Sequence, residues 1–60
     1  MKLKDKIVNS ISDGEIYTIR EIANKVNNKV GVVNREVLDL IAHRRVIKLQ
    51  GEFANGYKLR

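Results

Sequence analysis

The sequence predicts an α+β fold in which three helices are followed by a two-stranded hairpin at the C-terminus. In the first two thirds of the chain apolar residues recur at helical spacing, whereas from Val46 onward they alternate singly with polar residues. Thr18 and Glu21 form the Thr-x-x-Glu pattern that is typical of a helix start. The dipeptide Asn27-Asn28 then separates two helical stretches. No proline, repeat or linker divides residues 1–60, so the sequence predicts one domain.

The size and charge of the chain restrict the classes of function that fit it. A chain of 60 residues without cysteine has no disulfide or thiolate metal site to support its core. It is also short for a catalytic cleft, so we expect no enzyme activity, no cofactor and no metal. The 12 Lys and Arg residues against 7 Asp and Glu residues give a net charge of +5, which favours an anionic partner. No apolar run is long enough for a signal peptide or a membrane span, so we expect a cytoplasmic or nucleoid-associated protein with no membrane partner.

The first helix is predicted from four apolar residues at helical spacing, with the neighbouring lysines Lys2, Lys4 and Lys6 on a solvated face. The apolar set is Leu3, Ile7, Val8 and Ile11. Gly14 is expected to close this helix in the left-handed conformation. The β-forming residues of Glu15–Tyr17 then predict one short edge strand.

The second helix is predicted over Thr18–Val26, and its capping pair fixes where it begins. Its apolar stripe comprises Ile19, Ile22, Ala23 and Val26. Asn27 is expected to take the left-handed conformation after it. Asn28 is expected to cap the third helix by accepting from its first free N–H groups.

The third helix is predicted over about residues 29–43, with its outer face small or polar except for Leu38. The predicted buried stripe comprises Val30, Val33, Val37, Leu40 and Ile41. The opposite face comprises Gly31, Arg35, Leu38 and Ala42, flanked by Asn34 and Asp39. The carboxylates of Glu36 and Asp39 would repel phosphate unless they pair with Arg35 or His43. His43 is expected to satisfy carbonyl groups at the end of this helix.

The last segment, about residues 46–60, predicts a hairpin. Tyr57 and Leu59 are expected to point to one side, and Lys58 and Arg60 to the other. Two turn positions fit equally. Either Gly51-Glu52 forms a tight turn with Phe53 back in the ladder, or the stretch from Gly51 to Gly56 forms a longer tip.

Four local strings, in this order, resemble the winged helix-turn-helix superfamily. They are Thr18-Ile19-Arg20-Glu21-Ile22-Ala23, Val26-Asn27-Asn28, Val33-x-Arg35-x-Val37-x-x-Leu40 and Gly56-Tyr57-Lys58-Leu59. Two features depart from the family pattern. Arg44-Arg45 stands where many members have a glycine, and a register one residue later would put Ile47 rather than Val46 at the first core position of the wing. Asn34-Arg35 also resembles the pair in Z-alpha domains, which bind left-handed DNA, but Leu38 stands where those domains have tyrosine, and the wing has no proline.

The resemblance implies a small regulator of prokaryotic, archaeal or viral type that binds double-stranded DNA sequence-specifically, with the third helix in the major groove. Arg35 is the expected base reader, Asn34 an adenine reader or phosphate donor, and Gly31 a point of close approach. Leu38 completes that face. The expected phosphate contacts are Arg20, Lys25 and Lys29 on the helices and Lys48, Lys58 and Arg60 on the wing.

Two other functions fit the same residues. The first is a protein-interaction winged helix that uses Leu38, Phe53 and the wing as an apolar contact, and the second is nonspecific architectural binding of nucleic acid. A homodimer also fits, because a core of this size is marginal and many DNA readers bind two-fold sites. Its expected surface is the first helix around Val8, with the wing tip around Phe53 as the second choice.

Overall fold

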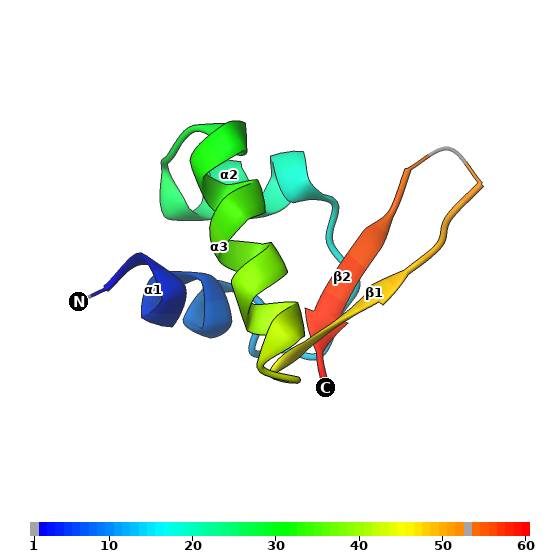
Figure 1. Ribbon diagram of the computed structural model, residues 1–60. Helices are drawn as coiled ribbons and strands as arrows, with labels where there is room; N and C mark the ends of the chain where they lie inside the picture. The colour runs from blue at the N-terminus through cyan, green and yellow to red at the C-terminus, as the bar shows by residue number, and fades with distance from the viewer. Residues whose placement is uncertain (1, 53) are drawn as a thin grey trace.

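The computed structural model describes residues 2–52 and 54–60 and places three helices against one hairpin (Figure 1). The elements in chain order are α1 (Leu3–Ser10), α2 (Ile19–Val26), α3 (Val30–Ala42), β1 (Val46–Leu49) and β2 (Gly56–Leu59). The helices pack on one another, and the hairpin extends from the C-terminal end of α3 with its tip directed away from them. The predicted α+β class is confirmed, and the arrangement is that of a winged helix-turn-helix. No helix in the described part of the chain is long and apolar enough to cross a membrane.

Helix α1 contributes the side chains of Ile7 and, just beyond its end, Ile11 to the core. Val8 is half-buried and packs against that core, so it widens the buried stripe. Gly14 has the predicted left-handed backbone, with φ of 80°, but it does not close α1. The helix ends at Ser10, and Gly14 instead turns the chain toward α2.

Both ends of α2 are as predicted. The N–H of Glu21 donates to Oγ1 of Thr18 at 3.2 Å, and the N–H of Thr18 donates to the Glu21 carboxylate at 3.0 Å. Asn27 is left-handed, with φ of 53°. The N–H groups of Asn27 and Asn28 donate to the carbonyls of Asn24 and Ala23, at 3.3 and 3.0 Å, which is a Schellman closure.

Helix α3 begins at Val30, one residue later than predicted. The capping residue is Lys29, and the Asn28 side chain accepts from the N–H of Lys29 at 2.8 Å instead of from the first helical N–H groups. The predicted cap is therefore wrong. Val30 was also misplaced in the buried stripe, because it is 43% exposed and burial begins one turn later, at Val33.

The core joins all three helices to the hairpin. Its buried members are Ile7, Ile11, Ile22, Ala23, Val33, Val37, Leu40, Val46 and Tyr57. Val46 is almost fully buried and Ile47 is half-buried, so Val46 occupies the first core position of the wing. Arg44 makes the corner between α3 and β1 with a left-handed backbone, at φ of 60°, where glycine is the usual residue.

The hairpin pairs Val46 with Leu59 and ends its ladder at Leu49 and Gly56. Residues 50–55 form the connection, which matches the longer of the two predicted tips, although Gly56 itself is paired. The alternative with Phe53 in the ladder falls on a residue outside the described ones. The predicted strand at Glu15–Tyr17 is wrong as a strand, since it is reduced to one antiparallel bridge.

That bridge joins Tyr17 to Tyr57 through two backbone hydrogen bonds. The Tyr17 N–H donates to the Tyr57 carbonyl at 2.9 Å, and the Tyr57 N–H donates to the Tyr17 carbonyl at 2.8 Å. The pairing goes no further because the chain turns at Gly14 and the α2 cap follows at once, at Thr18. The segment before α2 therefore lies along β2 (Figure 1).

Candidate nucleic-acid interface

The outer face of α3 is open to solvent and carries one cation. Gly31, Arg35, Leu38 and Ala42 are all exposed, as predicted, and Leu38 is 51% exposed. The Arg35 guanidinium forms no hydrogen bond or ion pair with the residues that the structure describes. A Cβ added at Gly31 would meet nothing within 4 Å, so the fold itself does not require glycine there. This face can approach a flat or grooved partner closely at Gly31.

The two carboxylates of α3 lie toward α1, where Lys4 contacts them. The Lys4 ammonium is in direct contact with the Asp39 carboxylate and lies 3.9 Å from Oε2 of Glu36. The hydrogen bond from Lys4 lowers the pKa of Asp39 and raises the pKa of Lys4. Lys4 is partly solvated, as predicted, with 40% of its side chain exposed, but its pairing with α3 was not predicted. Sequence spacing within α3 does not reveal this pairing, because it depends on how α1 packs across the helix.

Of the two partners predicted for these carboxylates within α3, His43 lies near Asp39 and Arg35 pairs with neither. Nδ1 of His43 lies 3.7 Å from Oδ1 of Asp39 and 2.8 Å from the Asp39 backbone oxygen. His43 is therefore placed to satisfy a carbonyl at the end of α3, as predicted. Arg35 has neither carboxylate as a partner among the described residues and stays on the outer face.

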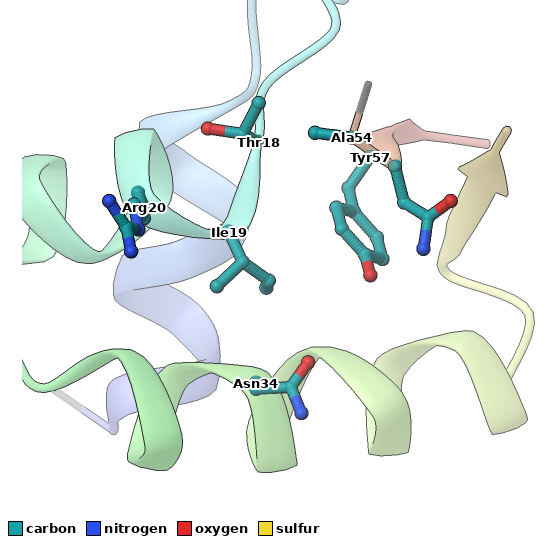
Figure 2. Close-up of a pocket in the computed structure, with 7 residues that line it drawn as sticks. Thr18, Ile19, Arg20, Asn34, Ala54 and Tyr57 are labelled. Atoms are coloured by element: carbon teal, nitrogen blue, oxygen red, sulfur yellow. The ribbon is translucent and has the colours of Figure 1, made fainter. Parts of the chain in front are cut away.

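A hollow of about 490 Å³ opens between the start of α2, the middle of α3 and the wing (Figure 2). Its lining residues are Thr18, Ile19, Arg20, Asn34, Ala54, Asn55 and Tyr57. It brings together two predicted residues, Arg20 and Asn34, and no carboxylate lines it. Sequence reasoning placed Tyr57 with Leu59 on one side of the hairpin and did not connect it with these polar groups, because the wing and α2 are far apart in the sequence and meet only in the folded chain.

A second hollow, of about 450 Å³, lies between the end of α3 and β1. Ile41, Val46 and Ile47 supply its apolar lining, and Arg44, Lys48 and Arg60 supply its charges. Lys48 and Arg60 were predicted, whereas Arg44 was read only as a corner residue. Its exposed position at the left-handed corner sets it beside the wing, and no sequence spacing predicts that neighbourhood.

Three of the predicted phosphate contacts lie outside these hollows. Lys29 is exposed at the start of α3, near its outer face. The Lys25 ammonium lies 4.7 Å from the centre of the Tyr17 ring, on the flank of α2 opposite to Arg20, about 140° around the helix. Lys58 pairs in register with Ile47, so it points to the face of the hairpin opposite to Tyr57. Lys25 and Lys58 are thus separated from the face of α3.

Within the described residues, no three His, Cys, Asp or Glu side chains come together as a metal site would require. Comparison of the chain with protein-family models, with curated proteins and with solved structures gives no match.

Proposed function

We propose that this protein binds double-stranded DNA as a sequence-specific transcriptional regulator, with α3 in the major groove and the wing along the backbone or the adjacent minor groove. The observation that carries the proposal is the outer face of α3, where the Arg35 guanidinium has no partner among the described residues and the flanking Asp39 carboxylate is paired with Lys4. The major groove, about 12 Å wide, admits one α-helix. Such a function belongs in the cytoplasm, at the nucleoid.

The chemistry of this face suits base reading. Arg35 can donate two hydrogen bonds to O6 and N7 of a guanine, and Leu38 can contact the methyl group of a thymine. Further cations lie around α3: Lys29 at its start, Arg20 with Asn34 at the first hollow, and Arg44, Lys48 and Arg60 at the second hollow near its end. Lys4 reduces the repulsion between the α3 carboxylates and DNA, because it neutralises one of their two charges.

The test combines selection of bound sequences from a random duplex pool with the variant Arg35→Ala. We expect a preferred sequence, an affinity that falls steeply with salt, and a loss of about 1–3 kcal/mol for Arg35→Ala on that sequence only. Lys2→Ala is the matched control, since Lys2 is an exposed cation before α1. Equal losses for Arg35→Ala on preferred and random duplexes would assign Arg35 to phosphate. Equal affinity of the parent for unrelated duplexes would indicate architectural binding instead of regulation.

A second candidate function, an apolar protein contact, is supported by the outer face of the wing. Ile16 is 57% exposed and lies against Gly56, where an added Cβ would come 2.3 Å from Cγ2 of Ile16. The half-buried side chains of Ile47 and Leu49 alternate with the inward-facing residues of β1. Binding through this surface would be nearly independent of salt, whereas binding to DNA would not. A homodimer remains a prediction, tested by sedimentation of the parent and of Val8→Glu.

A further inference from the structure

The hydroxyl of Tyr57, a residue of the core, has no hydrogen-bonding partner in the described parts of the chain. Tyr57 is 6% exposed, and its ring lies beside Ile19 with the hydroxyl directed toward α3 (Figure 2). Buried tyrosine hydroxyls normally have a partner. The hydroxyl of the other tyrosine, Tyr17, is at an exposed position and donates to the Asp13 carboxylate. The oxygen of Tyr57 is not sealed from solvent, and its side chain lines the hollow between α2, α3 and the wing.

The other groups around this hollow are mainly donors. Arg20 supplies a positive charge at α2, and Asn34 and Asn55 supply side-chain N–H groups from α3 and the wing. Oγ1 of Thr18 already accepts from the Glu21 N–H, which leaves its own O–H to donate. Since none of the seven lining residues is acidic, the hollow favours a ligand with several anionic oxygens.

We propose that the hollow holds one phosphate group of the DNA backbone, with the Tyr57 hydroxyl donating to a phosphate oxygen and Arg20 supplying charge at the rim. This inference rests on the proposed function and adds Tyr57 to the interface. A phosphate held here touches α2, α3 and the wing at once. It therefore sets the depth and angle at which α3 meets the bases, and it carries no sequence information of its own.

The variant Tyr57→Phe removes one oxygen and keeps the ring in the core. Because this hydroxyl has no partner in the free protein, we expect an unchanged or higher melting temperature. Affinity for every duplex should fall about tenfold, the loss expected for one hydrogen bond to a charged group. A lower melting temperature with unchanged affinity would show a structural role and would overturn the proposal.

Duplexes with one neutral methylphosphonate at each backbone position in turn locate the phosphate. We expect one position at which the substitution weakens the parent about tenfold and has little further effect on Tyr57→Phe. Tyr17→Phe is the matched control, since the Tyr17 hydroxyl is bonded to Asp13 and lies outside the hollow. It should retain the full sensitivity of the parent. The same pattern for the parent and Tyr57→Phe would reject this assignment.

Inorganic phosphate has the same chemistry and is tested separately by NMR titration of the free protein. We expect weak shifts of the backbone amide signals of the residues that line the hollow, and Tyr57→Phe and Arg20→Gln should diminish these shifts. Saturation at submillimolar phosphate, together with unchanged DNA affinity of Tyr57→Phe, would make the free anion the ligand and overturn the backbone assignment. A parent that binds no duplex would reject the proposed function itself. Binding that Tyr57→Phe does not weaken would reject only the phosphate assignment.

Discussion

Replacing Arg44 with glycine should stabilise this protein, although the Arg44 side chain is exposed. Arg44 has φ of 60°. Its N–H donates to the Ile41 carbonyl at 2.9 Å, and the next N–H, of Arg45, donates to the Leu40 carbonyl at 2.9 Å. These two bonds form a Schellman closure of α3, and its left-handed position is one that glycine occupies without strain.

The magnitude follows from two opposing terms. The left-handed conformation costs a residue with a Cβ about 1–2 kcal/mol, which glycine avoids. Glycine loses about 0.5–1 kcal/mol more backbone entropy on folding. The net gain for Arg44→Gly is therefore about 0.5–1 kcal/mol, or about 2–8 °C in melting temperature for a domain of this size.

Thermal unfolding followed by far-UV circular dichroism measures this gain, and two controls separate its causes. Arg44→Ala removes the same charge but retains the left-handed strain, so it should bring no gain. Arg45→Gly should lower the melting temperature, because Arg45 is not among the described residues with positive φ. The reasoning fails if Arg44→Gly does not raise the melting temperature. It also fails if Arg44→Ala raises it equally, since relief of charge repulsion would then be the cause.

Three further predictions concern charged groups. Lys48→Ala should reduce the slope of log affinity for DNA against log salt concentration by about one unit. Lys58→Ala, on the opposite face of the hairpin, should reduce this slope less. Equal slopes for both variants would show that the face of the hairpin does not matter. Lys4→Gln should raise the pKa of the Asp39 carboxyl, measured by NMR, because its hydrogen-bonding cation is lost; an unchanged value would mean that the two groups do not meet in solution. The hydroxyl of Tyr17 bonded to the Asp13 carboxylate raises the pKa of Tyr17 to about 12 and lowers the pKa of Asp13. Its contribution to stability should therefore disappear as pH rises from about 10 to about 12 and as pH falls below about 4, and a difference between parent and Tyr17→Phe that is constant with pH would contradict this.

The local features of this fold were predictable because each depends on residues close in the sequence. Thr18 and Glu21 fix the start of α2 through two reciprocal hydrogen bonds. Asn27 enters the left-handed region because its side chain tolerates that conformation. The change from helical to alternating periodicity at Val46 predicts the hairpin, because this pattern also depends on residues that are close in the sequence.

The features that sequence reasoning missed depend on packing between elements. The pairing of Lys4 with the α3 carboxylates needs the crossing of α1 over α3. The hollow around Tyr57 needs three segments that are far apart in the chain. The exposure of Val30 could not be predicted from the sequence either. Val30 lies at helical spacing from the buried residues of α3, and it is exposed because no other described element packs over the first turn of the helix.

The two hydrogen bonds between Tyr17 and Tyr57 attach the paired strands of the wing to the segment before α2, close to the outer end of the ladder. At that point β2 has β1 along one edge and the Tyr17 segment along the other. The paired strands therefore have little orientational freedom to lose when a partner binds, so ordering them adds little to the entropic penalty of association. A partner would meet these strands in the orientation that they already have in the free protein.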